Sequence, residues 1–195
     1  MDVKCYLKRS IFECDPYWPP FVGCDDYAAA ATIACFRVAY GARFAFPFIA
    51  LLNIMSLYQV RPAVARDAAT IAAIHVNTWQ EAYEGLLPEA DLKAISVDKR
   101  LKFWREAIQY GDPQVHVAVD GDRIVGFVGF DRSRDPKTKP TTGEIWAIYV
   151  GPGDWDQGAG LALWDAAREG LIDEGCTEVT LWVMLKNERA LRFFE

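Results

Sequence analysis

The sequence predicts a mixed α/β domain over residues 55–195, with its elements in the order β-α-α-β-β-β-α-β-α. Three observations support this class. Segments with apolar residues at every third or fourth position alternate with short runs rich in Val, Ile, Phe and Trp. An Asp-Gly pair joins two of these runs, as in a tight β-hairpin. A glycine-rich turn joins another run to a helical segment.

The region opens with an extended segment and a helix. We expect a strand at 58–61, which Pro62 stops, and then a helix that Asp67 caps and that Gly85 and Pro88 end. The predicted apolar face of this helix consists of Ile71, Ile74, His75, Thr78, Trp79 and Ala82.

A second helix and a hairpin follow. Ser96 is placed to cap a helix over 97–110. The runs "VHVAV" and "IVGFVGF" flank the residues 120–123, where Asp-Gly supplies the positive φ angles of a hairpin turn. Farther along, "EIWAIYV" and "EVTLWVM" predict two strands with a helix between them, and a last helix opens at Asn187.

Composition limits the functional classes. A chain of 195 residues with 52% apolar and 25% charged residues can bury a core. The net charge of −6 argues against general binding to nucleic acid, which needs clustered Lys and Arg. The cysteines lack the close spacing of zinc or redox motifs, so we expect reduced thiols, a cytoplasmic location and no metal. They stand at Cys5, Cys14, Cys24, Cys35 and Cys176.

Residues 1–54 differ from the rest of the chain. They show no sustained period of 2 or 3.6, so we interpret them as an extension of low regularity outside the native domain. The run at 44–60 carries no charge, but Pro47, Asn53 and Gln59 interrupt it, so a membrane span is not the favoured interpretation. The favoured one is a natural start at Met55, with a dispensable extension.

The glycine-rich turn lies between the predicted strand at 144–150 and the next helix. The first N–H groups of a helix have no partner within it, and glycines let a phosphate approach them. We expect the turn to hold an anion such as a pyrophosphate; a plain tight connection is the alternative. The element order excludes the dinucleotide-binding fingerprint, and no Gly-Lys-Ser/Thr follows as in a P-loop.

Four segments together resemble the GNAT superfamily of acyl-CoA-dependent N-acetyltransferases. They are "HVNTWQEAYEGLLP", "VAVDGDRIVGFVGF", "GEIWAIYVGPGDWDQGAGLALW" and "LWVMLKNERALRFFE". The resemblance covers residues 56–195 and implies a central, mostly antiparallel sheet with flanking helices. We expect the final two strands of that fold to be lacking after the last helix. We therefore expect the strand at 178–184 to be an unpaired sheet edge.

The resemblance also implies a coenzyme site. The strand at 144–150 would splay from its neighbour, so that backbone groups of Ile148 and Val150 pair with the pantetheine arm of acetyl-CoA. Asn187 would lie near the thioester. The pyrophosphate would be wrapped by the loop residues Trp155, Asp156, Gln157, Gly158, Ala159 and Gly160.

Several residues depart from the family pattern. Trp155 stands where the family often has Gln or Arg. Asp154 and Asp156 are unfavourable beside a phosphate and should point outward. Phe194 takes the apparent place of a tyrosine that often serves as general acid.

Glu144 is the predicted general base, because the resemblance places it at the position of the base in some family members. Even offsets along the strand would put its side chain on the same face as Ile148 and Val150. A solvated residue at the strand end is the alternative role for Glu144.

Four aromatic or histidine side chains are further candidates. By resemblance, Trp79 and Tyr83 would bind the acceptor substrate, and core packing is the alternative. His75 and His116 fit core histidines better than catalytic bases.

These features predict a transferase that moves an acetyl group from acetyl-CoA to a primary amine of a small molecule or a protein N-terminus by direct attack. A non-catalytic acyl-CoA-binding module and a membrane-tethered acetyltransferase are the alternatives. We expect no nucleic-acid partner, and a homodimer is compatible with the exposed sheet edge.

Overall fold

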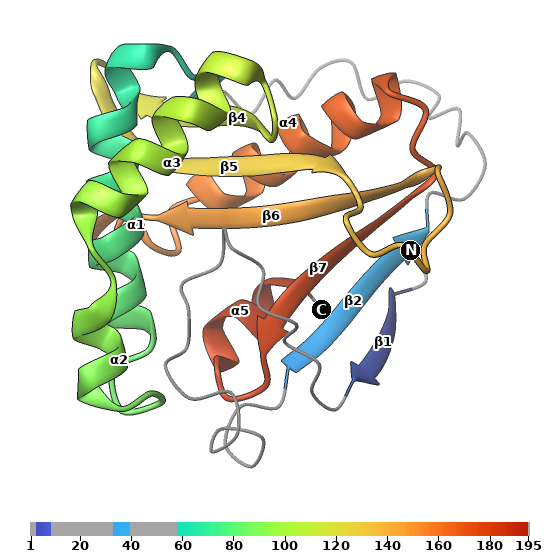
Figure 1. Cartoon of the computed structure of the whole chain (residues 1–195), viewed down its shortest axis with the longest axis horizontal. Coiled ribbons are helices and arrows are strands. Elements are labelled where there is room, and N and C mark those ends of the chain that lie inside the picture. The colour runs from blue at the N-terminus through green and yellow to red at the C-terminus, as the bar shows by residue number, and fades with distance from the viewer. Residues whose placement is uncertain (1–2, 9–32, 40–57, 195) are drawn as a thin grey trace.

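A computed structural model describes residues 3–8, 33–39 and 58–194 of the chain (Figure 1). The strands are β1 (Val3–Lys8), β2 (Ile33–Ala39), β3 (Gln59–Pro62), β4 (Gln114–Asp120), β5 (Arg123–Arg132), β6 (Thr142–Val150) and β7 (Glu178–Met184). The α-helices are α1 (Ala68–Ala82), α2 (Glu89–Ala94), α3 (Val97–Tyr110), α4 (Ala159–Asp173) and α5 (Glu188–Phe194). Short 3₁₀ turns η1 (Ala65–Asp67) and η2 (Pro152–Asp154) precede α1 and α4.

The described strands form one sheet of seven, in the order β1-β2-β7-β6-β5-β4-β3. Only β6 and β7 run parallel, and the other neighbours are antiparallel. The predicted mixed α/β fold, with a mostly antiparallel sheet and flanking helices, is confirmed.

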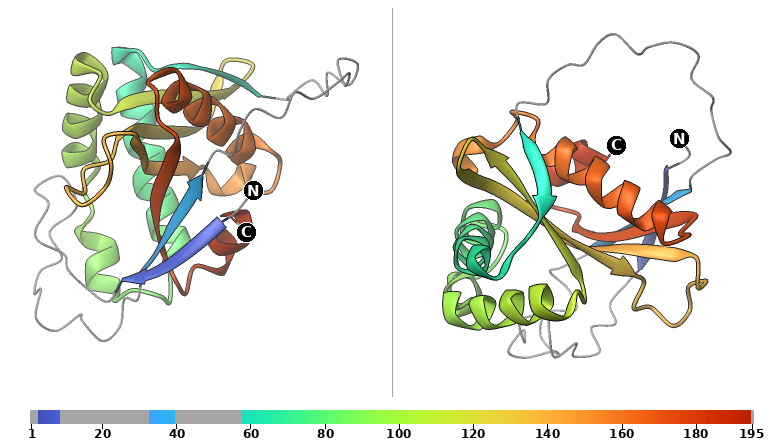
Figure 2. Two further views of the ribbon diagram at one scale, coloured as in Figure 1. Left: turned by 90° about the vertical axis from the view of Figure 1, so that its right-hand side faces the viewer. Right: turned by 90° about the horizontal axis from the view of Figure 1, so that it is seen from above.

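Helices cover both faces of this sheet (Figure 2). On one face α1 and α3 pack against β4 and β5, through Ile71, Ala72, Trp104, Ala107, Val115, Val117, Val119 and Phe127. On the other face α4 packs against β5, β6 and β7, through Val125, Val128, Phe130, Ile145, Leu163, Ala167, Leu171, Val179, Leu181 and Val183. We call these two sets the α1/α3 core and the α4 core.

Two local features differ from the sequence analysis. The sequence did not predict α2, a helix of six residues that follows Pro88. Asp67 does stand before α1, but its side chain makes no cap bond there. Its carboxylate instead accepts bonds from Val64 N at 2.9 Å and from Arg61 at 2.6 Å, because the chain turns through η1 before α1 begins. Ser96 caps α3 as predicted.

Strand β2 covers the edge of β7. Seven residues of β2 pair antiparallel with seven of β7, from Ile33 opposite Met184 to Ala39 opposite Glu178, and β1 pairs with the other side of β2. The prediction of an unpaired β7 edge is therefore wrong. Sequence periodicity could not reveal a pairing between segments so far apart in the chain.

The apolar run at 44–60 lies almost entirely outside the described residues. In the part of the chain that the structure describes, no helix combines the length and apolar character needed to cross a membrane.

Replacing Phe36 by proline tests the contribution of β2. Phe36 lies opposite Cys5 of β1 and Leu181 of β7, and proline removes a backbone donor from a strand that is paired on both sides. We expect the thermal midpoint to fall by several degrees, at roughly 2–4 °C for each kcal/mol lost. Val3→Pro is the control, because Val3 begins the edge strand, where proline is tolerated. Identical midpoints for wild type and both variants would show that β2 does not stabilise the sheet.

Candidate functional site

A β-bulge interrupts β6 in its middle. Gly129 of β5 lies opposite Ala147, whereas the next residue, Phe130, lies opposite Ile145. Trp146 is therefore an extra residue in β6. A bulge bends its strand and increases the local twist, so β6 changes direction at Trp146.

The bulge also changes which side chains share a face. Ile145, Ile148 and Val150 all pack with the α4 core. Adjacent strand residues point to opposite faces, so Glu144 points to the α1/α3 side. The prediction that Glu144 shares a face with Ile148 and Val150 is wrong, because the extra residue inverts the alternation between them.

Strands β6 and β7 separate after the bulge begins. Their ladder comprises the residues 142–145 and 178–181, although β6 continues to Val150 and β7 to Met184. Figure 1 shows the two strands diverging toward their carboxyl ends. We call the region between the diverging parts of β6 and β7 the strand opening.

The backbone of β6 presents polar groups to the strand opening. Gly151 N–H donates to the Val125 carbonyl of β5 at 2.8 Å. Because the hydrogen-bonding direction alternates along a strand, the N–H and C=O groups of Ile148 and Val150 face away from β5. These are the two residues whose backbone was predicted to contact a coenzyme.

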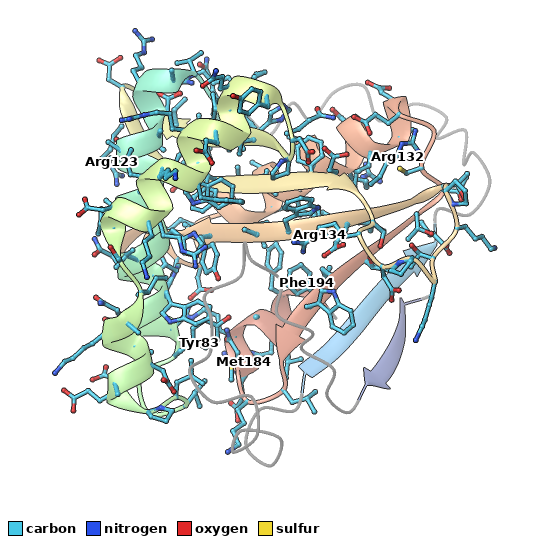
Figure 3. All side chains as sticks on the ribbon, viewed as in Figure 1. Tyr83, Arg123, Arg132, Arg134, Met184 and Phe194 are labelled. Atoms are coloured by element: carbon cyan, nitrogen blue, oxygen red, sulfur yellow. The ribbon has the colours of Figure 1, made fainter. Side chains whose placement is uncertain are left out.

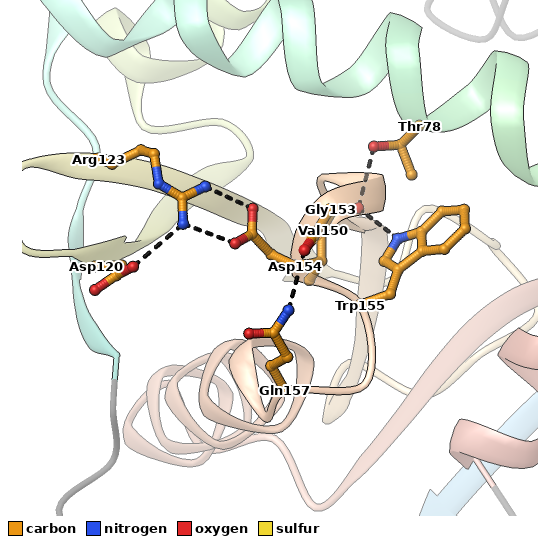
Figure 4. Close-up of polar contacts among 8 residues, drawn as sticks. All are labelled: Thr78, Asp120, Arg123, Val150, Gly153, Asp154, Trp155 and Gln157. Carbon is orange, nitrogen blue, oxygen red and sulfur yellow. Dashed lines mark hydrogen bonds and ion pairs between the residues drawn. The ribbon is translucent and has the colours of Figure 1, made fainter.

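The Val150 carbonyl is already occupied (Figure 4). It accepts a bond from Trp155 Nε1 at 2.7 Å and another from Thr78 Oγ1 at 3.1 Å. A carbonyl oxygen has two lone pairs. The groups left for a ligand in the strand opening are therefore the N–H and C=O of Ile148 and the N–H of Val150.

The glycine-rich turn leads into the N-terminus of α4. Gly158 is the N-cap residue, with φ of 95°, and no side chain caps the helix there. The first helical bond is Ala162 N–H to Gly158 C=O at 3.1 Å, so the N–H groups of Ala159, Gly160 and Leu161 precede it. With the helix dipole, these groups favour an anion.

Side chains of the turn hold its shape (Figure 4). Asp154 accepts two bonds of 2.7 Å from Arg123, which lower the pKa of its carboxyl. Gln157 Nε2 donates to the Gly153 carbonyl at 3.0 Å. The Asp154 side chain is thus paired with β5, and the Gln157 side chain is bonded within the turn.

Arg189 of α5 also contacts the glycine-rich turn. Its guanidinium bonds the Asp156 carboxylate and lies 4.2 Å from the centre of the Trp155 ring. Both acidic residues of the turn are therefore paired with arginines, which offsets their charge near the α4 N-terminus. The groups that remain for an anion are backbone N–H groups.

Glu144 is buried, with only 3% of its surface exposed. One carboxylate oxygen accepts from Arg134 Nη2 at 2.6 Å and the other from Arg134 N at 3.0 Å. The same guanidinium lies 3.9 Å from the centre of the Trp146 ring. The loop before β6 therefore holds this carboxylate close to the bulge, and Glu144 is not a solvated strand-end residue.

The residues that match a known family span most of this region. Residues 74–195 match the Acetyltransferase (GNAT) family. The protein belongs to this family. The uncharacterized N-acetyltransferase YuaI of Bacillus subtilis is 30% identical over 132 residues, which are 67% of this chain and 74% of YuaI. The mycothiol acetyltransferase of Kocuria rhizophila is 30% identical over 145 residues, so the match spans 70% of this chain and 44% of that relative.

Solved structures share the fold of this GNAT protein. The PaiA N-acetyltransferase of Thermoplasma acidophilum, in complex with coenzyme A, has a TM-score of 0.63 at 17% identity, over 70% of this chain and 86% of that one. YncA of Salmonella typhimurium, solved with its cofactor acetyl-CoA, has a TM-score of 0.55 at 21% identity, over 69% and 75% of the two chains. Family membership makes the GNAT protein an acyltransferase.

The predicted acceptor residues lie at the end of α1. Trp79 is buried in a third core cluster with Val76, Leu87, Leu92 and Ile95. Tyr83 is half-buried, and its ring meets Trp79 edge-on at 4.5 Å between centroids. Tyr83 and Tyr149 of β6 both pack against this cluster. The sequence carried no signal for Tyr149, because only the fold brings it to Tyr83.

His75 of the GNAT protein is a core residue. It is 6% exposed, its ring stacks on Tyr149 at 4.7 Å, and its Nδ1 accepts a bond from Trp104 Nε1 at 3.1 Å. Burial, helped by the positive charge of Arg100, holds its pKa well below 6.5. His75 is therefore neutral and already bonded, which agrees with the core interpretation.

The sequence analysis also predicted no metal site and reduced thiols. Among the described residues, no three or more His, Cys, Asp or Glu side chains are grouped as a metal site would need. Cys176 is buried, and burial raises the pKa of its thiol. An activated nucleophile needs the opposite shift.

The buried His75 predicts a pH dependence of stability. Its folded-state pKa lies well below the unfolded value near 6.5, so the unfolded chain binds the proton first as pH falls. His75 should therefore cost the fold about 1.4 kcal/mol between about pH 7.5 and 5.5. Urea unfolding across this range should show a smaller loss in His75→Gln than in wild type. His116→Gln, which removes the other of the 2 histidines in the chain, is the comparison. If the dependence of the unfolding free energy on pH is unchanged in His75→Gln, the assignment of His75 as a buried neutral residue is contradicted.

Proposed function

We propose that this GNAT protein transfers the acetyl group of acetyl-CoA to a primary amine of a small molecule or a protein N-terminus. The observation that carries the proposal is the strand opening, which presents backbone groups of Ile148 and Val150 beside the N-terminus of α4. The pantetheine arm contains two amides, which complement a strand backbone. The pyrophosphate would bind the first N–H groups of α4. Coenzyme-bound PaiA and YncA, which share the fold, support the same assignment.

Direct attack is the proposed route. The amine, once deprotonated, adds to the thioester carbonyl, and the tetrahedral intermediate collapses to an amide and the thiolate of CoA. A backbone N–H of β6 in the strand opening would stabilise the oxyanion. Alignment of the amine with the thioester accounts for much of the rate enhancement.

Glu144 is the proposed general base. A carboxylate offers about four acceptor positions, and Arg134 uses one on each oxygen. A water can therefore bridge Glu144 to the amine, which suits a carboxylate that is buried and points to the α1/α3 side.

A non-catalytic acyl-CoA-binding module is the second candidate. Phe194 favours this candidate, because it has no hydroxyl to serve as the general acid. Its ring lies 5.7 Å from that of Trp164. The cytoplasmic location, the absence of a metal requirement and a homodimer remain predictions, as does the membrane-tethered alternative.

Substitution of Gly160 tests the coenzyme site. An added Cβ would lie 3.2 Å from the Phe193 ring, so Gly160→Ala needs only a small shift of that ring. Gly160→Asp also places a negative charge beside the proposed pyrophosphate. At about 100 times its Kd, acetyl-CoA should raise the thermal midpoint of wild type and Gly160→Ala by roughly 5–10 °C. The Gly160→Asp variant should lose most of this shift, and an undiminished shift in a folded Gly160→Asp protein would contradict the loop assignment.

A panel of primary amines, with release of free CoA detected as thiol, tests catalysis. An enzyme releases CoA with its acceptor present, whereas a binding module binds acetyl-CoA without release. On the best amine, Glu144→Gln should lower kcat by about 10²- to 10⁴-fold, and higher pH should recover part of the loss as the amine deprotonates unaided.

The matched control for Glu144 is Arg134→Met. This variant removes the cation that holds Glu144 but keeps the carboxylate. If Glu144 is the base, kcat should fall by less than about tenfold, well under the range for loss of a base. Equal losses of kcat and stability in both variants would show that the pair only fastens the loop before β6.

A further inference from the structure

The last residues of β7, at 182–184, lie beside the strand opening. The ladder between β6 and β7 ends at the pair Ile145 and Leu181, so these residues follow its last pair. Strand β2 continues along the other side of β7 as far as Met184, and its residues 33–35 lie opposite residues 182–184. We call residues 182–184 the distal half of β7. Among the described strands, β2 is the only one that pairs with it.

Side chains hold the distal half on both faces of the sheet. Val183 is buried in the α4 core. Met184 packs with Tyr83 of α1 against the third core cluster (Figure 3). These contacts fix the two faces of the distal half, whereas its backbone is held along the sheet by β2.

The distal half leads into α5, which returns to the glycine-rich turn. Asn187 N donates to the Met184 carbonyl at 2.9 Å, and Asn187 Oδ1 accepts from Ala190 N at 3.1 Å. A short capped turn therefore connects β7 to α5. Arg189, in the first turn of α5, bonds Asp156 of the glycine-rich turn. A displacement of the distal half would therefore also displace α5 and Arg189.

These contacts form a frame around the strand opening. One side is β6, where Trp155 of the glycine-rich turn donates to the Val150 carbonyl. The other side is β7, which reaches the same turn through α5. The second half of β6 is paired with β5 as far as Val150, whereas the distal half of β7 is paired with β2 alone in the described part of the chain. The pairing with β2 therefore controls how far β7 stands from β6.

We propose that β2 is a positioning strand of the coenzyme site. By pairing with the distal half of β7, it holds the strand opening at the width that admits the pantetheine arm. This inference rests on the proposed function. It makes residues 33–39 necessary for binding, contrary to the expectation that residues 1–54 are dispensable. Because coupling between two sites is reciprocal, acetyl-CoA should in turn stabilise the pairing of β2 with β7.

Two proline variants of the full chain separate this role from general stabilisation. Ala34 lies opposite Val183 in the distal half, whereas Val38 lies opposite Val179, which is also paired with Gly143 of β6. The two positions are an even number of residues apart in a strand that is paired on both sides, so proline removes an equivalent N–H from each. Both variants should lower the thermal midpoint, but only Ala34→Pro loosens one side of the strand opening.

Titration calorimetry at a temperature below all midpoints measures the affinity for acetyl-CoA. If the binding-competent opening is populated in about one tenth of the Ala34→Pro molecules, the affinity falls about tenfold, and we expect a loss of this size or more. Val38→Pro should bind as wild type does. Wild-type affinity in Ala34→Pro, or equal losses in the two variants, would overturn the role of β2.

Amide hydrogen exchange of the wild-type chain tests the reciprocal effect without any substitution. Acetyl-CoA should slow exchange more in residues 33–35 than in residues 37–39 of the same strand. Exchange that is unchanged in both segments would overturn the proposal even if Ala34→Pro does not fold. Failure of wild type to bind acetyl-CoA would overturn the proposed function as well, whereas binding without either effect overturns only the role of β2.

Discussion

The bulge at Trp146 is the constraint on which the site depends. One extra residue bends β6 away from β7 after four residue pairs, although both strands continue. The backbone of Ile148 and Val150 is thereby turned toward a strand opening instead of a neighbouring strand. The same residue inverts the alternation of side chains, so that Glu144 points to the α1/α3 side while Ile148 and Val150 face the α4 core.

Other contacts hold the end of β6 and the glycine-rich turn in place after the bend. Thr78 and Trp155 both donate to the Val150 carbonyl, which ties the end of β6 to α1 and to the glycine-rich turn. Arg123 and Arg189 pair the acidic residues of that turn and leave its backbone N–H groups for an anion. Backbone groups thus dominate the proposed coenzyme contacts, and side chains hold the backbone in place.

Much of this fold could be predicted from the sequence, because local signals determine it. The Asp-Gly turn, Ser96 and the apolar periodicity of α1, α3 and α4 each act within a few residues. The pairing of β2 with β7 could not be predicted, since it joins residues that are distant in the chain. The bulge left no signal either, because "EIWAIYV" reads as an uninterrupted apolar strand.

The site shows the same division between local and long-range information. The glycine-rich turn and the Ile148 and Val150 backbone were predicted from adjacent residues, with the family resemblance. The Arg134 partner of Glu144 and the meeting of Tyr83 with Tyr149 depend on long-range packing. In particular, the strand-face argument for Glu144 failed because a period of 2 holds only in a regular strand.

Amide hydrogen exchange tests the central claim most directly, because it reports on the backbone of β6 residue by residue. Binding of acetyl-CoA should slow exchange at the Ile148 and Val150 amides, which face the strand opening. The Tyr149 amide faces β5 and should change little, so it serves as an internal reference. Acetyl-CoA binding that leaves exchange at Ile148 and Val150 unchanged would contradict the account.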